Sequence, residues 1–125
     1  MLVTAAAGTG IGFSVARRCV EEGATVMISD IHERRLAEAA ARLRDIGGRP
    51  VATQLCNVTR EDQVRSLVSA AVIELGRIDV LVNNAGLGGT ARIVDMTDDQ
   101  WNVVLDVTLN GTFRMTRAVL AHMLD

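Results

Sequence analysis

The stretch Thr4-Ala5-Ala6-Ala7-Gly8-Thr9-Gly10-Ile11-Gly12 decides the fold of this chain. It joins an apolar run, residues 1–5, to an amphipathic run, residues 12–22, and so reads as a glycine-rich turn between a strand and a helix. Glycine lets a phosphate approach the backbone closely, and the first turn of the helix offers free N–H groups. The glycines alone are equally compatible with a phosphate-binding turn and with a tight turn that binds no ligand.

Strand-like and helix-like patterns then alternate to the end of the chain. Gly23, Gly47-Gly48 and Gly76 follow helical runs as C-terminal caps, Thr59 is expected to cap the third helix, and Thr97 with Gln100 forms a capping box. The predicted strands are residues 1–5, 24–29, 51–56 and 78–82, and the predicted helices are residues 12–22, 33–46, 60–75 and 98–123.

This order predicts an α/β fold, a Rossmann-type doubly wound parallel sheet of about four strands and four helices. The first and fourth strands are expected to be neighbours, which leaves the apolar strand 78–82 at an edge open to pairing. We expect one nucleotide-binding domain over residues 1–125, incomplete at its C-terminus and slightly so at its N-terminus.

Composition excludes several classes of protein. A hydrophobic content of 49% with 22% charged residues argues against disorder, and a net charge of −2 gives no electrostatic case for nucleic acid. No apolar run approaches the roughly 18 residues that a membrane helix needs, and the first residues do not resemble a secretion signal. The two cysteines and two histidines form no ligand cluster, so no metal is expected. These features predict a cytoplasmic protein.

Asp30 ends the second predicted strand, 18 residues after Gly12. A carboxylate there can accept hydrogen bonds from the adenosine ribose and repel a 2′-phosphate, which favours NAD(H) without excluding NADP(H). A helix N-cap is the alternative role, and beside the glycines the ligand role is favoured. Arg34 and Arg35 could meet a 2′-phosphate, but the acidic residues that flank them favour a solvent-facing helix surface.

Polar residues also follow the third and fourth predicted strands. Asn57-Val58 is placed to border an adenine, although asparagine also favours a plain turn. Asn83-Asn84-Ala85-Gly86 places two amides after a buried strand, where they must be hydrogen-bonded. We expect them to tie neighbouring loops together or to contact a cofactor.

The last predicted helix, residues 98–123, has apolar residues on more than one face. Burial against the sheet is one explanation, and a subunit partner in a homo-oligomer is the other. Phe13 and Phe113 are expected in the core, and Trp101 is expected to serve packing.

Together these segments resemble the short-chain dehydrogenase/reductase family over the whole chain, which spans about the first half of that family's domain. Asn83-Asn84-Ala85-Gly86 is the most specific element, and Asp30 matches the family's NAD-favouring acidic residue. The chain is most similar to bacterial 3-oxoacyl-carrier-protein reductases and to actinobacterial reductases of steroid-ring breakdown. The resemblance implies these cofactor-binding residues: Gly8, Gly10, Ile11, Gly12, Asp30, Asn57, Val58, Asn84, Ala85 and Gly86.

The chain departs from the family pattern at four points. Alanine replaces the first motif glycine and the turn is one residue longer. Asn57 replaces the usual aspartate, and its amide oxygen is expected to accept from the adenine amine. Thr108 occupies the position of the family's catalytic asparagine, which puts a proton relay there in doubt. The catalytic serine and the Tyr-x-x-x-Lys motif are absent, and the chain has no tyrosine and no lysine.

The resemblance implies an oxidoreductase that transfers a hydride between NAD(H) and a ketone or secondary alcohol. This chain would be its cofactor-binding fragment, expected to be inactive alone. A non-catalytic nucleotide-binding module is the alternative. An S-adenosylmethionine-dependent methyltransferase is less favoured, because Ala7 stands where an acidic residue is expected.

Overall fold

The computed structural model describes residues 1–89 and 91–124. Four parallel strands form one sheet in the order β3-β2-β1-β4. This order confirms the predicted α/β architecture and places the first and fourth strands side by side. The strands are β1 (Leu2–Val3), β2 (Met27–Asp30), β3 (Ala52–Leu55) and β4 (Leu81–Val82).

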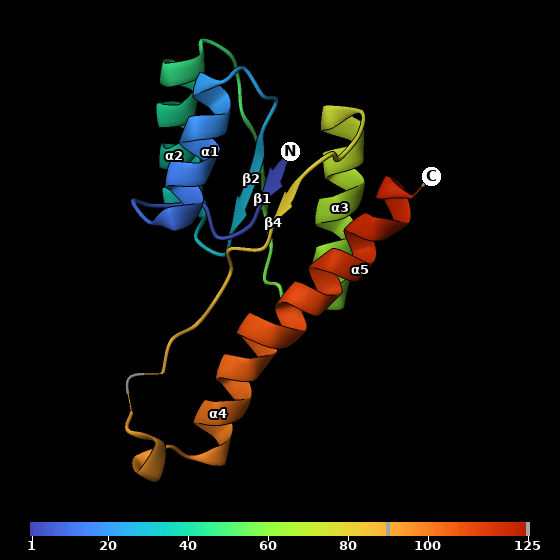
Figure 1. Ribbon diagram of the computed structural model, residues 1–125. Helices are drawn as coiled ribbons and strands as arrows, with labels where there is room; N and C mark the ends of the chain where they lie inside the picture. Colours follow the sequence, from blue (N-terminus) through green and yellow to red (C-terminus); the bar gives the residue numbers. More distant parts are fainter. Residues whose placement is uncertain (90, 125) are drawn as a thin grey trace.

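Helices cover both faces of the sheet (Figure 1). One face carries α1 and α2, and the other carries α3 and α5. The helical elements are α1 (Ile11–Glu21), α2 (Glu33–Gly47), α3 (Glu61–Leu75), the 3-10 turn η1 (Ile93–Asp95), α4 (Asp98–Leu105), the π-helical segment η2 (Asp106–Asn110) and α5 (Gly111–Met123).

Two apolar clusters form the core, one on each face of the sheet. Successive strand residues point to opposite faces, so Leu2 and Met27 pack toward α3 and α5 while Val3 and Ile28 pack toward α1 and α2. All four side chains are almost fully buried. Burial on both faces explains why these strands read as continuous apolar runs.

The strands are shorter than their apolar runs, and one predicted cap is wrong. Arg60, and not Thr59, is the N-cap of α3. Thr59 lies one residue before that cap, and its hydroxyl donates to Asn57 Oδ1 at 2.9 Å in the turn that precedes the helix. The left-handed glycines after α1 and α2 are confirmed, with φ of 84° at Gly23 and 70° at Gly48.

The last predicted helix forms over its expected span, with the π-helical segment η2 inside it. The capping box of Thr97 and Gln100 is confirmed. Its α4 end extends away from the sheet (Figure 1), and therefore Trp101 is half exposed. The expectation of a core position for Phe113 is wrong, because its side chain is 58% exposed, whereas Phe13 is buried.

Candidate functional site

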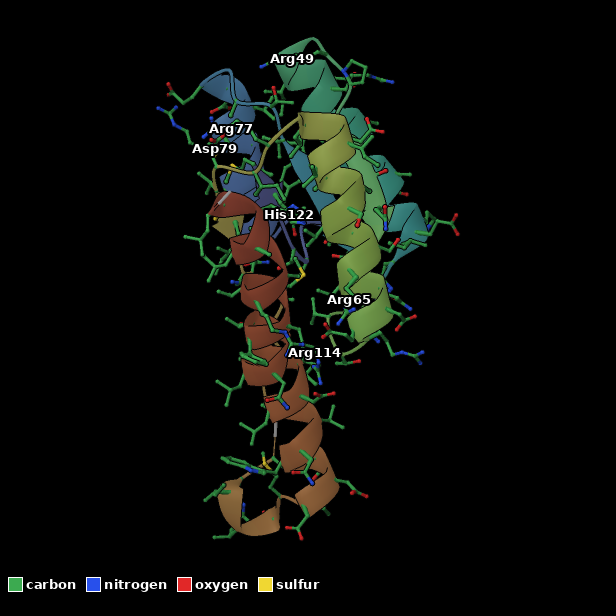
Figure 2. The ribbon with its side chains drawn as sticks, turned by 90° about the vertical axis from the view of Figure 1, so that its right-hand side faces the viewer. Arg49, Arg65, Arg77, Asp79, Arg114 and His122 are labelled. Atoms are coloured by element: carbon green, nitrogen blue, oxygen red, sulfur yellow. The ribbon has the colours of Figure 1, made fainter. Side chains whose placement is uncertain are left out.

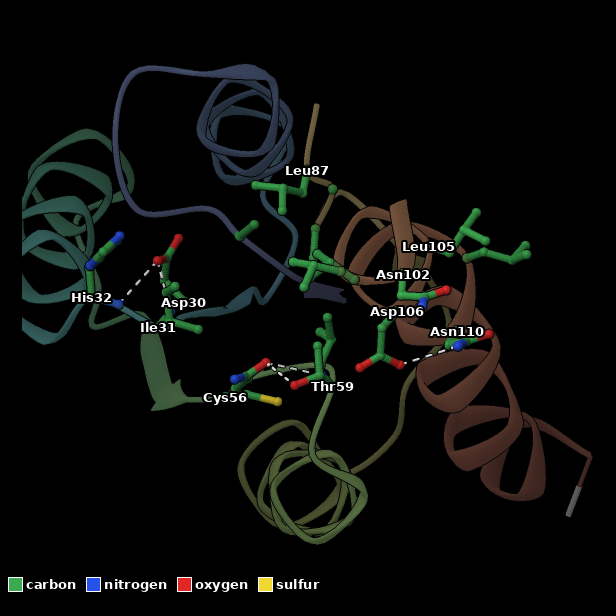
Figure 3. Close-up of a pocket in the computed structure, with 18 of the residues that line it drawn as sticks. Asp30, Ile31, His32, Cys56, Thr59, Leu87, Asn102, Leu105, Asp106 and Asn110 are labelled. Atoms are coloured by element: carbon green, nitrogen blue, oxygen red, sulfur yellow. Dashed lines mark hydrogen bonds between the residues drawn. The ribbon is translucent and has the colours of Figure 1, made fainter. Parts of the chain in front are cut away.

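The carboxyl ends of all four strands meet at one edge of the sheet, beside the long helix. A cleft of about 1100 Å³ opens there, and Figure 3 shows the side chains that line it. Five of the predicted site residues line this cleft: Asp30, Asn57, Val58, Ala85 and Gly86. Ligands of doubly wound sheets bind outside the carboxyl ends of the strands, so this cleft is the candidate site.

Asp30 fastens the glycine-rich turn to the end of β2. Its Oδ2 accepts from the Ala7 N–H at 3.1 Å, and its Oδ1 accepts from the N–H groups of Ile31 and His32 at 2.8 and 3.1 Å. The N-cap of α2 is His32, so Asp30 is not that cap. A carboxylate has about four acceptor positions, and one of them therefore stays available on Oδ2.

The glycine-rich turn needs backbone conformations that most residues avoid. Gly8 has φ of 144°, and Ala5, which stands where the family has its first glycine, has φ of 50°. Ala5 is the one non-glycine residue with positive φ in the described part of the chain. Gly8 lies apart from the main cleft, in a smaller pocket beside α2. Gly10 and Ile11 are exposed where α1 begins.

Gly12 is held to glycine by its neighbours within the protein. A Cβ there would lie 2.5 Å from Asn84 Nδ2 and 2.8 Å from the Ala5 oxygen. The same Asn84 amide donates to the Ala5 oxygen at 2.9 Å. The expectation that these amides tie neighbouring loops together is confirmed for Asn84, whereas Asn83 donates to Thr116 Oγ1 and so ties the loop to helix α5.

Thr4 is a site-forming residue that sequence reasoning missed. Its buried hydroxyl donates to the Val82 oxygen at 3.2 Å and accepts from the N–H groups of Asn84 and Ala85. It therefore sets the start of the loop after β4. A polar residue at the end of a buried strand is the signal that could have identified it.

Asn57 does not present its amide oxygen to the cleft as expected. That oxygen accepts from both the N–H and the hydroxyl of Thr59, at 3.0 and 2.9 Å (Figure 3). Its contact with an adenine amine stays a prediction: these two donors already fill the two acceptor positions of an amide oxygen, so the amine would have to displace one of them. The side-chain N–H₂ of Asn57 makes no hydrogen bond to another described residue.

Thr108 holds the loop after β4 to the long helix. Its hydroxyl accepts from the Leu87 N–H at 3.1 Å and lies 3.3 Å from the Leu87 oxygen, to which it can donate. Thr108 belongs to η2, and π-helical segments recur at functional sites. Gly86 lies against it, since a Cβ on Gly86 would be 3.9 Å from Thr108 Oγ1.

Asp106, which also lines the cleft, forms an ion pair with Arg114 over 2.7 Å. It also accepts from the Asn110 amide at 3.2 Å (Figure 3). The hydrogen bond from Arg114, with that from Asn110, holds the pKa of the Asp106 carboxyl below its ordinary value of 3.8. Asp106 is therefore ionised near neutral pH.

Positive charge lies near the glycine-rich turn, on α2. Arg34 pairs with Glu38 over 2.6 Å, and its side chain is exposed, which agrees with the predicted solvent-facing position. Arg42 lies over the Phe13 ring at 4.1 Å and donates to the Gly8 oxygen at 3.4 Å. Arg35 and Arg42 line the same small pocket beside the turn as Gly8.

Two further potentially reactive side chains are Cys56, which also lines the cleft, and His122. Burial, with a smaller contribution from Asp62, raises the pKa of the Cys56 thiol to about 11. His122 lies near the far end of α5 (Figure 2).

Across residues 1–89 and 91–124, no three His, Cys, Asp or Glu side chains gather as metal ligands. Within the same ranges, no helix is both long and apolar enough to cross a bilayer.

Comparison with known proteins places this geometry in a family. The model of the short chain dehydrogenases matches residues 1–125. The chain belongs to the short-chain dehydrogenase family. It spans about half the length of the curated relatives it matches.

Two of these relatives are bacterial reductases. The chain is 54% identical over 125 residues to the (5R,7aS)-5-hydroxy-7a-methyl-1-oxo-2,3,5,6,7,7a-hexahydro-1H-indene-carboxyl-CoA reductase of Mycobacterium tuberculosis, covering 100% of this chain and 48% of that protein. It is 38% identical to the 3-oxoacyl-[acyl-carrier-protein] reductase FabG of Thermotoga maritima, and the match covers 98% of this chain and 49% of that protein. Both likenesses agree with those expected from the motifs.

Solved structures of the family share the fold. A short chain dehydrogenase from Mycobacterium smegmatis is similar at a TM-score of 0.93 and 55% identity, covering 97% of this chain and 50% of that one. An actinorhodin polyketide ketoreductase with NADPH is similar at a TM-score of 0.90 and 37% identity, and the match covers 95% of this chain and 45% of that one. An NAD⁺-bound xylitol dehydrogenase is similar at a TM-score of 0.92 and 35% identity, and the match covers 98% of this chain and 47% of that one. Members with this fold thus bind either nicotinamide cofactor.

Proposed function

We propose that this chain is the cofactor-binding half of an oxidoreductase that transfers a hydride between NAD(H) and a ketone or secondary alcohol. The observation that carries the proposal is the convergence of Asp30, Asn57-Val58 and Ala85-Gly86 on one cleft at the carboxyl edge of the sheet. These residues come from three different strand ends. A dinucleotide long enough to touch all of them fits this arrangement better than a small ligand does.

The groups present fit a nicotinamide dinucleotide. The available position on Asp30 Oδ2 accepts from a ribose hydroxyl, and the N–H groups at the start of α1 receive the pyrophosphate. A Cβ on Gly10 would meet no atom within 4 Å, so this part of the turn stays open to an approaching phosphate. Val58 and the free amide N–H₂ of Asn57 border the adenine. The bound cofactor would supply the hydride.

NAD(H) is favoured over NADP(H) because Asp30 places a carboxylate where a 2′-phosphate would come. Arg35 and Arg42 lie beside the glycine-rich turn, and their charge moderates that preference. The substrate, a small carbonyl or alcohol compound, and the general acid would meet the cofactor in a part of the enzyme that this chain does not supply. We further propose that the protein forms a homo-oligomer through the long helix, residues 98–123, and that it is located in the cytoplasm.

The test is a titration of the isotope-labelled chain with NADH, NADPH and S-adenosylmethionine, followed by NMR. We expect weak binding of NADH, weaker binding of NADPH, and shifted amide signals at Asp30, Val58 and Gly86. Gly10→Ala should weaken NADH binding by about tenfold, equivalent to ~1.4 kcal/mol, because its methyl group obstructs the pyrophosphate. No ketone should be reduced.

Three results would contradict the proposal in different ways. Tighter binding of S-adenosylmethionine than of NADH would indicate a methyltransferase. Binding of NADH with shifts away from these three residues would place the site elsewhere. Turnover by the purified chain would show that the acid and base of the reaction lie within residues 1–125.

A further inference from the structure

Arg114 lies where the long helix crosses the connection between β3 and α3. From the contacts described below, we infer that Arg114 is a positioning residue that couples the Val58 end of the cleft to the Leu87 end. The inference rests on the proposed function in that the cleft holds a dinucleotide. The mechanical link itself depends on the protein's own contacts alone.

The Arg114 guanidinium makes three polar contacts on two elements. It pairs with Asp106 Oδ1 at 2.7 Å and reaches the backbone oxygens of Asp106 and Val58, each at 3.4 Å. Side chains of a helix lean toward its N-terminus, so Arg114 lies back along η2 (Figure 2 labels it). The Arg114 side chain is 21% exposed, and this partial burial strengthens a charged hydrogen bond relative to one in open solvent.

A second contact brings the same two elements together independently of charge. A Cβ on Gly111 would lie 2.6 Å from Val58 Cγ2 and 3.1 Å from Val58 Cβ. The helix therefore approaches the β3–α3 connection as closely as glycine permits. Gly111 contacts the Val58 side chain while Arg114 contacts the Val58 backbone, and Val58 also lines the cleft.

The other end of the link is η2. Its first residue, Asp106, is the anchor of Arg114, and the Asp106 oxygen also accepts the Gly111 N–H in the π-helical pattern. Thr108 lies within this segment and holds both backbone polar groups of Leu87. A shift of η2 would therefore move Thr108 relative to Leu87, which lines the same cleft as Val58.

Arg117, one turn further along α5, provides a matched control. It pairs with Glu61 of α3 over 2.7 Å and lies over the Phe113 ring at 4.7 Å. It thus makes an ion pair and an aromatic contact of its own, and its side-chain hydrogen bond goes to Glu61 of α3 rather than to η2 or Val58. The same substitution at Arg114 and Arg117 separates positioning of η2 from general stabilisation of α5.

The experiment is amide hydrogen exchange of the cofactor-free chain, read at Leu87, with Met27 of β2 as the reporter of the fold. In Arg114→Met we expect exchange at Leu87 to rise by about tenfold or more, since a hydrogen bond to a charged group is lost. Asp106→Asn should give a smaller rise, and Arg114→Lys should restore part of the protection. Exchange at Met27 should be unchanged in all of them.

Unchanged exchange at Leu87 in both Arg114→Met and Asp106→Asn would overturn the inference. An equal rise in Arg117→Met would do the same, because it would reduce Arg114 to general helix stability. If Arg114→Met does not fold, the comparison of Leu87 exchange in Asp106→Asn with that in Arg117→Met tests the inference instead. A rise in Asp106→Asn alone supports it, and any other pattern overturns it. An NADH titration of the same proteins distinguishes failure of this inference from failure of the proposed function. Absence of NADH binding in every variant would contradict the proposed function, whereas the exchange at Leu87 would still test the role of Arg114.

Discussion

Two glycines of the same turn are glycine for different reasons. Gly12 is confined by Asn84 and by the Ala5 oxygen, so its constraint lies inside the protein. Gly10 has open space around it, so nothing within the described chain requires it to be glycine. The phosphate-binding interpretation treated both alike, because spacing along the sequence does not reveal which glycine faces a neighbour and which faces a ligand.

Unfolding of the cofactor-free chain should separate these two roles. Gly12→Ala is expected to lower the free energy of unfolding by about 1–3 kcal/mol, because the methyl group displaces Asn84 or the turn. Gly10→Ala should change it by no more than about 1 kcal/mol, since a residue with φ of −82° is not strained by a side chain. Urea denaturation followed by circular dichroism measures both. Equal losses in the two variants would contradict the structural reading of Gly12.

Among the elements, the long helix shows most clearly how the structure modifies a correct prediction. Its start at the Thr97 capping box and its span agree with the sequence, since both depend on residues a few positions apart. The π-helical segment η2 was not predicted. It arises where Gly111 lets the helix pack against Val58, and that contact joins residues far apart in the sequence.

The ion pair across η2 should make stability depend on pH in the acid range. The pKa of Asp106 is lower in the folded chain than its ordinary value of 3.8. Its stabilising contribution is therefore fully present above that ordinary value and is lost as the pH falls through the lowered folded value. At neutral pH we expect Asp106→Asn to unfold at lower urea concentration than the wild type.

The check is a series of urea denaturations of both proteins from pH 7 down through pH values below 3.8. The difference in free energy of unfolding should stay constant at first and then narrow at the acid end. Glu74→Gln, which changes an exposed carboxylate on α3, serves as the control. A gap between wild type and Asp106→Asn that does not narrow in acid would rule out this linkage.

At the scale of the whole molecule, much apolar surface remains uncovered. Phe113 and Leu120, seven residues apart on α5, are 58% and 42% exposed. Exposed apolar patches of this kind mark sites of association between proteins. Burial against the sheet, the first of the two explanations for the apolar long helix, accounts for one side of α5, where Met115 and Val119 join the core.

The exposed side of α5 should drive self-association of the chain. We expect sedimentation velocity to show association that grows with concentration, as apolar area is removed from water. The double variant Phe113→Gln with Leu120→Gln should need at least about tenfold more protein to associate equally, equivalent to ~1.4 kcal/mol. Ile73→Gln removes an even more exposed apolar side chain from α3, and it should leave association unchanged. A concentration-independent monomer in the wild type would contradict the prediction.

The sequence by itself determined the order of the main strands and helices, the pairing of the first strand with the fourth, and the strand ends where Asp30 and Gly86 lie. Periodicity, caps and crossover handedness depend on near neighbours or on general rules of chirality, so they can be read without coordinates. Only the tertiary structure decided that Asn57 turns its oxygen to Thr59, that Thr4 organises the loop after β4, and that Arg114 reaches Val58. A hydrogen bond goes to the partner that packing brings within reach, and packing joins residues that the sequence keeps far apart.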